Sequence, residues 1–331
     1  MAGKTMRAVI YDKYGGGASA LKHVEVPVPS PGKDKVLLKV EAATVNPYDW
    51  KIQKGVTRPF YPRKFPYIPA TDVAGEVVEG GPGVEEFKAG DKVIAFLGAA
   101  TAGGLAEYAV ASKNMMVLRA PGLSAAEGAG LPVAALTAYK CLVDTAGLKL
   151  DGSGEKKNVL ITAASGGVGH YAVQIAKLAN THVTATCGSR NLDLVRSLGA
   201  DEILDYKTPE GAMLKSSSGK KYDVVLNCTS GIPWSTFEGN LSKNGLVIDI
   251  SPGPSTMLRY AWKTATFSRK KLLPLILSPT KELMESVMEL VAAGKVKTLI
   301  DSRHPLGRAE DAWAKSLGGH VTGKVIVEFE P

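Results

Sequence analysis

One segment constrains the fold of this chain more than any other: VLITAASGGVGHYAVQIAKLA, residues 159–179. Its first residues form a short apolar, β-branched run typical of a buried parallel strand, and apolar residues then recur at helical spacing. In a turn between such a strand and helix, unpaired amides of the helix N-terminus converge, and the helix dipole favours an anion. The segment therefore predicts a strand–turn–helix unit that can hold a pyrophosphate.

The turn matches the dinucleotide fingerprint G-x-G-x-x-G at its second and third glycines, and the first position is Ala164. Taken alone, this partial match leaves two interpretations open, a cofactor turn and a tight loop that needs glycine for its own geometry. The candidate cofactor-binding residues of the turn are Ser165, Gly166, Gly167, Val168 and Gly169.

The end of the next predicted strand indicates which dinucleotide would bind. An acidic residue about twenty positions after the fingerprint binds the ribose hydroxyls of NAD, whereas small and basic residues accept the 2′-phosphate of NADP. Here the sequence HVTATCGSRN places Ser189 and Arg190 at that point, with no acid. An isolated arginine is commonly a solvated cation, but the strand, the spacing and the missing acid together favour NADPH. Gly188, Ser189 and Arg190 are the candidate residues.

The 331 residues, 45% of them hydrophobic, are enough for two domains. The pattern of residue types changes near residue 125. The first part predicts a small β-barrel or sandwich, and the second an alternation of strands and helices that forms a doubly wound parallel sheet with helices on both faces, an α/β fold. Strands are expected at 7–11, 36–42, 74–79, 92–96 and 106–109, and then at 158–162, 182–186, 202–205, 223–227 and 246–250. After Pro279, a helix is expected at 281–293, with strands at 296–300 and 324–328 that return to the first domain.

Several classes of protein are disfavoured by composition. No apolar run approaches the length of a membrane-spanning helix, and the N-terminus resembles neither a signal peptide nor a transit peptide. Three distant cysteines indicate no disulfide framework and a reducing compartment. The net charge of +8 is scattered and accompanies no nucleic-acid-binding motif, so we expect no nucleic-acid partner.

Several segments in order resemble one family along almost the whole chain: IPATDVAGEVVEGGPGVEEFKAGDKV, LPVAALTAY, VLITAASGGVGHYAVQIAKL, SLGADEILDYK and TGKVIVE. They are similar to the zinc-free quinone oxidoreductases of the medium-chain dehydrogenase/reductase superfamily. NPYDWKIQKG, RPFYPRKFP, GIPWSTFE and AEDAWAKS resemble its plant chloroplast envelope members. The resemblance implies a chaperonin-10-like catalytic domain (1–129 and 280–331), a Rossmann NADPH-binding domain (130–279) and an active site in the cleft between them.

Further cofactor-binding candidates come from the predicted strand ends and from the resemblance. The ends of parallel strands line the nicotinamide half of a dinucleotide site, which selects Asn227, Cys228, Ser251 and Gly253. The resemblance adds Tyr206, beside the adenosine phosphate, and Thr137.

The resemblance also allows a test for a catalytic metal. The positions that hold zinc ligands in the zinc-dependent branch correspond here to Asn46, Thr71 and roughly Val133. A catalytic zinc needs about three nitrogen, sulfur or carboxylate donors, and these three residues do not supply them. The four-cysteine lobe of that branch is also absent after Asp91-Lys92-Val93. We therefore expect no metal.

Without a Lewis acid, hydride transfer requires an acceptor that is already electrophilic, and the resemblance implies a quinone or an α,β-unsaturated carbonyl. Asn46 is a candidate for positioning the nicotinamide ribose or the substrate oxygen, or it forms an Asx-turn before Pro47. Lys51 is a candidate for the positive charge near the enolate that hydride transfer to an unsaturated carbonyl would leave, or else it is a solvated lysine. Tyr67 or Tyr61 is a candidate hydrogen-bond donor to the same oxygen, or else a packing residue.

The segment 257–277, MLRYAWKTATFSRKKLLPLIL, mixes aromatic, basic and aliphatic residues. A subunit or domain contact, consistent with a homodimer, is favoured there over a peripheral membrane contact. The resemblance favours the chloroplast envelope without a cleaved transit peptide, and cytoplasm is the alternative. Two further functions stay open: a double-bond reductase for one specialised plant metabolite, and a non-catalytic NADPH-binding or structural protein.

Overall fold

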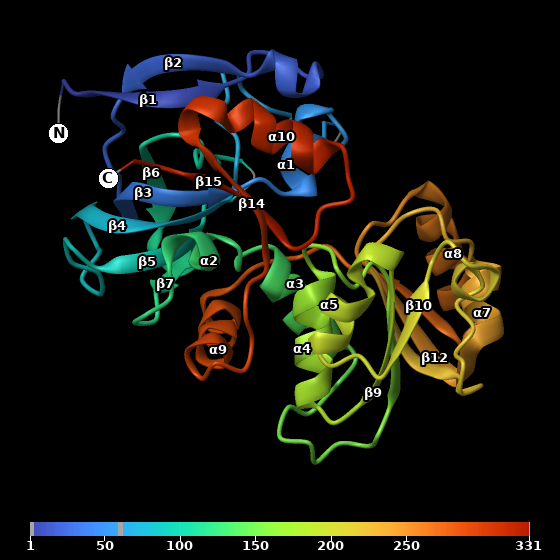
Figure 1. Ribbon diagram of the computed structural model, residues 1–331. Coiled ribbons are helices and arrows are strands. Elements are labelled where there is room, and N and C mark those ends of the chain that lie inside the picture. Colours follow the sequence, from blue (N-terminus) through green and yellow to red (C-terminus); the bar gives the residue numbers. More distant parts are fainter. Residues whose placement is uncertain (1–2, 59–61, 99, 331) are drawn as a thin grey trace. The chain divides into compact units, whose positions relative to one another are not determined.

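The computed structural model describes residues 3–58, 62–98 and 100–330, and these form two compact units (Figure 1). Unit 1 contains the chain up to Val133 together with the chain from Pro279 onward. Unit 2 is the continuous segment Ala134–Ser278. Each unit has its own sheet, and each is described separately below.

Unit 2 is built on a six-stranded sheet in the order β10-β9-β8-β11-β12-β13, in which every neighbouring pair is parallel. This is the predicted doubly wound sheet, and its order reverses direction between β8 and β11. The strands are β8 (Asn158–Ile161), β9 (His182–Cys187), β10 (Glu202–Asp205), β11 (Tyr222–Asn227), β12 (Leu241–Asp249) and β13 (Lys271–Pro274).

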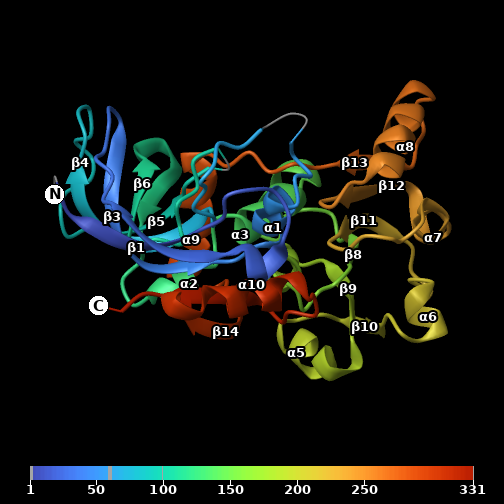
Figure 2. The same cartoon turned by 90° about the horizontal axis from the view of Figure 1, so that it is seen from above.

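One helix of unit 2 precedes β8 and the others connect the strands of the sheet, and Figure 2 shows α8 close to the edge strand β13. The first of them, α3, continues into a π-helical stretch, Lys140–Thr145. The helices are α3 (Ala134–Tyr139), α4 (Gly169–Leu178), α5 (Leu192–Ser197), α6 (Pro209–Ala212), α7 (Trp234–Asn240) and α8 (Pro254–Ala265). Among the described residues, no helix combines the length and apolar character needed to cross a bilayer.

Unit 1 is β-rich, as its short apolar strands and turn residues predict. Two strands, β1 (Thr5–Ile10) and β2 (Lys22–Pro27), pair antiparallel, and a larger sheet follows the order β14-β15-β3-β4-β5-β7, with β6 also paired to β3. Its strands are β3 (Lys35–Thr44), β4 (Asp72–Gly80), β5 (Lys92–Phe96), β6 (Tyr108–Ser112), β7 (Met116–Leu118), β14 (Ile300–Pro305) and β15 (Lys324–Glu328). The helices are α1 (Pro47–Gln53), α2 (Ala125–Ala129), α9 (Lys281–Ala292) and α10 (Ala309–Leu317).

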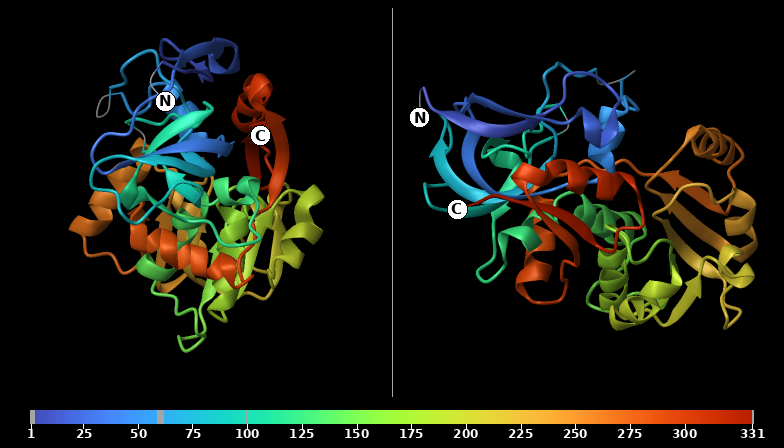
Figure 3. Two further views of the ribbon diagram at one scale, coloured as in Figure 1. Left: turned by 90° about the vertical axis from the view of Figure 1, so that its left-hand side faces the viewer. Right: turned by 45° about the horizontal axis from the view of Figure 1, so that its top comes forward.

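The long strand β3 divides one of its edges between two partners. It pairs with β4 along its length, with β6 through its first half, and with β15 through its last residues. The C-terminal segment therefore joins the sheet formed by the first part of the chain, as expected, and Figure 3 shows this red segment beside the blue strands. Trp313 of α10 is fully buried in the resulting core, where its indole Nε1 donates to Gln53 Oε1 at 3.1 Å.

Two expected strands of unit 1 were misplaced. Residues 296–299 form no strand, and β14 starts only at Ile300, where pairing with Lys324 of β15 begins. The prediction at 106–109 began too early, because the pairing of β6 with β3 begins at Tyr108. In both cases the partner strand, which the local pattern does not reveal, sets the boundary.

Candidate functional site

In unit 2 the glycine-rich turn joins β8 to α4, and hydrogen bonds hold it against β9. The amide of Ala164 donates to the carbonyl oxygen of Thr186 at 2.8 Å, and the amide of Ala163 donates to Thr186 Oγ1 at 3.1 Å. Within the turn, the amide of Gly166 donates to the carbonyl oxygen of Ala163 at 2.9 Å. Residues 165–168 therefore lead into the first turn of α4, where helical amides lack partners within the helix.

The last glycine of the turn is required by the close packing of α4 on the end of β8. A β-carbon at Gly169 would lie 2.3 Å from the carbonyl oxygen of Ala163 and 2.6 Å from the Cα of Ala164. The side chain of Ala164 is itself fully buried, so the alanine at the first fingerprint position fills core space. The turn thus has the close backbone approach of a dinucleotide-binding fingerprint.

The loop after β9 is coupled to this turn by one hydrogen bond. Asn191 Nδ2 donates to Ser165 Oγ at 2.9 Å, and both side chains are buried. Gly188 precedes Ser189 and Arg190, and these two are exposed. The structure therefore brings the candidate residues for the pyrophosphate and for the 2′-phosphate together at the carboxyl ends of β8 and β9.

Tyr206 lies beside this loop. A β-carbon at Gly188 would be 3.4 Å from the hydroxyl oxygen of Tyr206, which is exposed just after β10. The acid nearest in sequence, Asp193, accepts a hydrogen bond from Arg196 Nη1 at 2.8 Å. Arg190 and Ser189 of this loop, with Tyr206 beside it, thus occupy the region where an NAD-specific site presents a carboxylate.

At the switch point between β8 and β11, polar side chains are linked to one another. Thr162 Oγ1 donates to Asn227 Oδ1 at 2.8 Å and accepts from the amide of Cys228 at 2.9 Å. Asn227 Nδ2 donates to the carbonyl oxygen of Thr229 at 2.9 Å. Burial raises the pKa of the Cys228 thiol well above its usual range. The side chain of Asn227 and the backbone of Cys228 are therefore held in place at the ends of β8 and β11.

Asp249, which sequence reasoning missed, fixes the loop after β12. Its Oδ1 accepts from the amide of Ser251 at 2.9 Å, and its Oδ2 accepts from Thr256 Oγ1 at 3.1 Å. Gly253 immediately precedes α8. Thr137 is buried in α3 and belongs to the same unit.

In unit 1 the strand register gathers three polar side chains inside the fold, those of Asn46, Asp72 and Lys324. Thr44 of β3 pairs with Ile326 of β15 and with Asp72 of β4. Because side chains two residues apart share a face, extending the β3–β15 register by two residues sets Lys324 against Asn46. All three polar residues are almost completely buried, and Lys324 is only 3% exposed.

The Asn46 amide links the buried ammonium to a buried carboxylate. Lys324 Nζ donates to Asn46 Oδ1 at 2.6 Å, and Asn46 Nδ2 donates to Asp72 Oδ2 at 2.9 Å. Asp49, on α1, accepts a hydrogen bond from the backbone N–H of Asn46 at 2.7 Å. Asn46 thus starts α1 and also occupies the centre of an ionic cluster. We call Asn46, Asp49, Asp72 and Lys324 the buried cluster.

Burial dominates the ionisation of the buried cluster. It lowers the pKa of Lys324 to about 8, against the attraction of Asp72 and Asp49. It raises the pKa of Asp49 to about 8, and the charge of Asp72 adds to this effect. Burial also raises the pKa of Asp72, but Lys324 and hydrogen bonds from the amide of Val133, from Asn46 and from Thr71 act in the opposite direction. More groups therefore favour the charged form of Asp72 than that of Asp49, whose pKa burial raises to about 8.

The other predicted catalytic residues, Tyr67 and Lys51, also belong to unit 1. Tyr67 is buried against Tyr11, with ring centroids 5.3 Å apart, and burial followed by the charge of Asp49 raises the pKa of its hydroxyl. Lys51, on α1, is half-buried, with its Nζ 5.9 Å from the ring centroid of Trp50. The alternative tyrosine, Tyr61, lies outside the described residues.

Comparisons with known families and proteins agree with this arrangement. Residues 32–122 match the alcohol dehydrogenase GroES-like domain, and residues 198–327 match a family described as zinc-binding dehydrogenase. The chain is 66% identical to the quinone-oxidoreductase homolog, chloroplastic, of Spinacia oleracea, over 99% of this chain and 100% of that protein. It is 65% identical, with the same coverage, to the chloroplast envelope quinone oxidoreductase homolog of Arabidopsis thaliana.

The chain belongs to the quinone oxidoreductases of the medium-chain dehydrogenase/reductase superfamily. A more distant relative, the NADPH-dependent alkenal/one oxidoreductase, chloroplastic, of Arabidopsis thaliana, is 30% identical over 98% of this chain and 80% of its own length. Among solved structures, the quinone oxidoreductase from Coxiella burnetii superposes with a TM-score of 0.87 at 28% identity, covering 99% of this chain and 100% of that one. The GroES-like and Rossmann folds predicted from the sequence are confirmed.

The zinc implied by the name of one matched family does not fit the residues of this quinone oxidoreductase. The three corresponding positions, Asn46, Thr71 and Val133, all donate hydrogen bonds to Asp72, through an amide, a hydroxyl and a backbone N–H. Donors directed at one carboxylate are not the nitrogen, sulfur and carboxylate set that binds zinc. Across the residues that the structure describes, no group of three or more His, Cys, Asp or Glu side chains could hold a metal ion. Lys324 provides the positive charge in this region.

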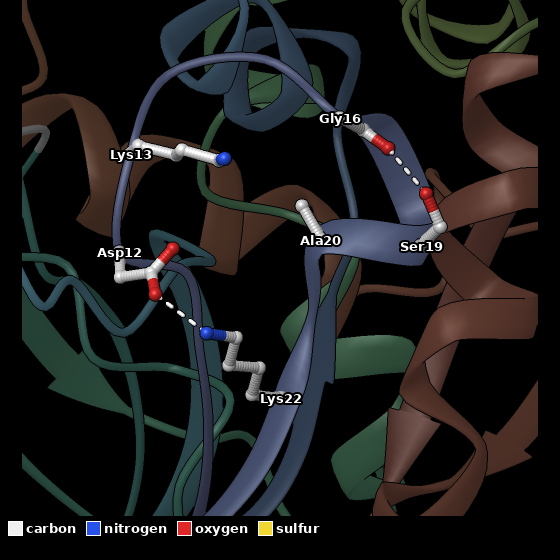
Figure 4. Close-up of a pocket in the computed structure, with 6 residues that line it drawn as sticks. All are labelled: Asp12, Lys13, Gly16, Ser19, Ala20 and Lys22. Carbon is white, nitrogen blue, oxygen red and sulfur yellow. Dashed lines mark hydrogen bonds and ion pairs between the residues drawn. The ribbon is translucent and has the colours of Figure 1, made fainter.

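A surface depression of unit 1 has no features of a catalytic site (Figure 4). Its polar groups bond to one another: Lys22 Nζ contacts Asp12 Oδ2 at 2.5 Å, and Ser19 Oγ donates to the carbonyl oxygen of Gly16 at 2.9 Å. Lys13 and Ala20 complete its lining. An exposed ion pair of this kind contributes little to stability.

The first prediction concerns the turn. Gly169→Ala should destabilise unit 2 by about 1–3 kcal/mol and weaken NADP⁺ binding at least about tenfold, because the new β-carbon would clash with backbone atoms. Thermal unfolding and calorimetric titration with NADP⁺ measure both effects. Gly239→Ala, in a helix of the same unit with open space around the glycine, is the matched control and should bind normally. Parental affinity in Gly169→Ala would contradict the assigned turn.

The second prediction concerns the buried cluster. Lys324→Met should lower the free energy of unfolding by about 3–5 kcal/mol, because it leaves buried carboxyls without a counter-charge. The pKa values of both carboxyls lie above their usual range and that of Lys324 is lowered to about 8, so the loss should be measured near pH 7, where Lys324 keeps its proton, and should shrink as acid protonates the carboxyls. Denaturant unfolding at several pH values measures this.

Two variants serve as controls for that experiment. Lys324→Met combined with Asp72→Asn should recover part of the stability, since both charges are then removed. Lys33→Met, at an exposed position of the same unit, should change stability little. A Lys324→Met protein as stable as the parent near pH 7 would show that the charge of Lys324 does not stabilise the cluster.

Proposed function

We propose that this quinone oxidoreductase is an NADPH-dependent, metal-independent reductase that transfers hydride to quinones or to the carbon–carbon double bond of α,β-unsaturated carbonyls, including oxidised-lipid ketols. The observation that carries the proposal is the combination of a dinucleotide turn in unit 2 with a zinc-ligand position in unit 1 that has become an internal hydrogen-bond network. The first feature supports a nicotinamide cofactor. The second supports an acceptor that needs no Lewis acid.

The cofactor-binding part of the proposal assigns roles to the residues of unit 2. Residues 165–169 would bind the pyrophosphate through backbone amides and the start of α4. Ser189, Arg190 and Tyr206 would bind the 2′-phosphate, and the strand-end residues with Thr137 would line the nicotinamide half. NADPH bound in this way supplies a hydride, and the protein provides orientation and a polar environment.

The acceptor part of the proposal assigns roles in unit 1. Reduction of a quinone or an enone leaves negative charge on the acceptor oxygen, and preoriented donors stabilise such charge. Tyr67, whose raised pKa keeps its hydroxyl protonated, is the proposed donor, and Lys51 the proposed nearby cation. Asn46 is a proposed positioning residue, because its side chain already bonds to Lys324 and Asp72.

The cellular setting is also a proposal. Because the chloroplast relatives match along the whole chain at high identity, we place the protein at the chloroplast envelope as a peripheral component, acting on a small-molecule acceptor. We retain the homodimer as its proposed assembly.

Cofactor preference gives a direct test of the 2′-phosphate site. Arg190→Gln with Ser189→Ala should weaken NADPH binding about ten- to a hundredfold and leave NADH binding nearly unchanged, because hydrogen bonds to a charged phosphate are lost. Steady-state kinetics with each cofactor measures this. Arg196→Gln, at the cation that pairs with Asp193, is the matched control. Equal losses for both cofactors would place the phosphate elsewhere.

Acceptor choice tests the proposed reaction. With NADPH, purified protein should reduce quinones and enones and leave saturated ketones untouched, because only the former accept hydride without an activating metal. NADPH absorbance and product analysis measure this. Turnover of saturated ketones alone would contradict the metal-free acceptor site, and turnover of no acceptor would favour a non-catalytic NADPH-binding protein. A strict preference for one plant metabolite would favour the dedicated double-bond reductase.

A further inference from the structure

In unit 1 the segment between α1 and β4 is tied to the residues that follow β1. The backbones of Tyr11 and Tyr67 exchange two N–H to carbonyl hydrogen bonds, at 3.0 and 2.9 Å, and their rings lie 5.3 Å apart. The ring of Phe65 packs against Tyr11 at 5.9 Å and edge-on against Tyr14 at 4.9 Å. The backbone N–H of Arg63 donates to Tyr14 Oη at 2.7 Å. These contacts hold Arg63 and the proposed donor Tyr67 on one anchored segment.

The side chain of Arg63 lies beside Tyr67 and lacks a counter-charge. Its Cζ is 6.0 Å from the centroid of the Tyr67 ring, a separation at which a guanidinium stacks on an aromatic face. Among the residues that the structure describes, Arg63 Nε is shielded from solvent and has no hydrogen-bond partner, and no ion pair joins the guanidinium to a carboxylate. Because shielding a charged donor without an acceptor is costly, this atom is suited to an acceptor that a ligand brings.

The charge around Tyr67 favours a negative oxygen at this place. Burial, followed by the charge of Asp49, raises the pKa of the Tyr67 hydroxyl, and the charge of Arg63 acts in the opposite direction. A charge that favours a negative oxygen on Tyr67 also favours a negative oxygen on a molecule bound beside it. The segment 50–71 contains no aspartate or glutamate, and its five cations are Lys51, Lys54, Arg58, Arg63 and Lys64.

The cations of this segment have different aromatic neighbours. The Nζ atoms of Lys51 and Lys54 lie 5.9 and 4.7 Å from the ring centroid of Trp50, on α1. Arg63 instead lies over the ring of Tyr67, the residue whose hydroxyl is the proposed donor. Arg63 also carries several N–H groups in a planar fork, so it can bond to an oxygen as well as attract it. Arg63 is therefore placed and equipped to act together with Tyr67.

We propose that Arg63 is a catalytic residue that binds, together with the hydroxyl of Tyr67, the acceptor oxygen on which negative charge develops. The inference rests on the reductase function proposed above and adds to it a second donor to the oxyanion. When hydride from the dihydronicotinamide forms a C–H bond at the β-carbon of an enone, the π electrons shift to the carbonyl oxygen, which becomes an enolate oxygen, and the nicotinamide is oxidised. Arg63 donates hydrogen bonds to this oxygen and keeps its own proton. The α-carbon then takes a proton from water, and the carbonyl group forms again.

Binding of para-nitrophenolate, an unreactive anion that resembles the enolate oxygen, tests the proposal without turnover. The full chain should bind this anion more tightly than the neutral para-nitroanisole, as absorbance and calorimetric titration measure. Arg63→Gln should weaken binding of the anion about ten- to a hundredfold, because hydrogen bonds between charged groups are lost, and should leave para-nitroanisole binding unchanged. Arg63→Lys should restore part of the affinity. Lys64→Gln, at the neighbouring exposed cation, is the matched control and should bind like wild type.

A wild-type protein without preference for the anion, or an Arg63→Gln protein with wild-type affinity, would overturn the proposal. A measurement on the wild type covers the case in which Arg63→Gln does not fold. The Nε–H resonance of Arg63, assigned by its absence from the spectrum of Arg63→Lys, should shift when para-nitrophenolate is added. A resonance that stays in place at saturating anion would also overturn the proposal.

Turnover separates this proposal from the reductase function on which it rests. With NADPH and an enone, Arg63→Gln should lower kcat about ten- to a hundredfold and change KM little, because the charge on the oxygen appears in the transition state. Equal kcat in Arg63→Gln and wild type would overturn the role of Arg63 and leave the reductase standing. Selective binding of para-nitrophenolate without turnover of any acceptor would reject the reductase, and with it the catalytic role of Arg63.

Discussion

The buried ammonium of Lys324 is the interaction on which unit 1 depends. It joins the start of β15 to Asn46, and through the Asn46 amide to Asp72 at the start of β4. Asn46 also begins α1, so one charge connects the C-terminal strand, the central sheet and the first helix. A buried charge is costly unless it is compensated, and here Asn46 hydrogen-bonds both Lys324 and Asp72. The three positions considered for zinc from the sequence, Asn46, Thr71 and Val133, all donate hydrogen bonds to Asp72 of this network.

Unit 2 depends on a steric constraint at its glycine-rich turn. Gly169 allows α4 to approach the end of β8 closely, and Asn191 then bonds the next loop to Ser165. The parallel sheet gathers the remaining strand ends at the same edge, where Asp249 and Thr162 hold the loops in place. Backbone geometry therefore shapes the cofactor region of unit 2, whereas a buried lysine linked to a carboxylate through Asn46 shapes the proposed acceptor region of unit 1.

Local sequence patterns predicted the parts of the fold that depend on local chemistry. The strand–turn–helix unit and the parallel sheet built on it were readable, whereas the 2′-phosphate residues and the absence of zinc at Asn46 stay predictions. Lys324 and Asp72 were not, because a charged residue at the start of an apolar strand looks the same whether it faces solvent or core. Their burial follows from the pairing of β15 with β3, more than two hundred residues apart.

The central claim is that the charge of Lys324, and not a metal ion, completes the polar site of unit 1. Elemental analysis of purified protein, combined with quinone reduction before and after exhaustive chelation, tests it most directly. The account predicts far less than one zinc per chain, the same turnover after chelation, and no gain when zinc is added. Turnover that rises in proportion to bound zinc, disappears on chelation and returns with zinc would contradict it.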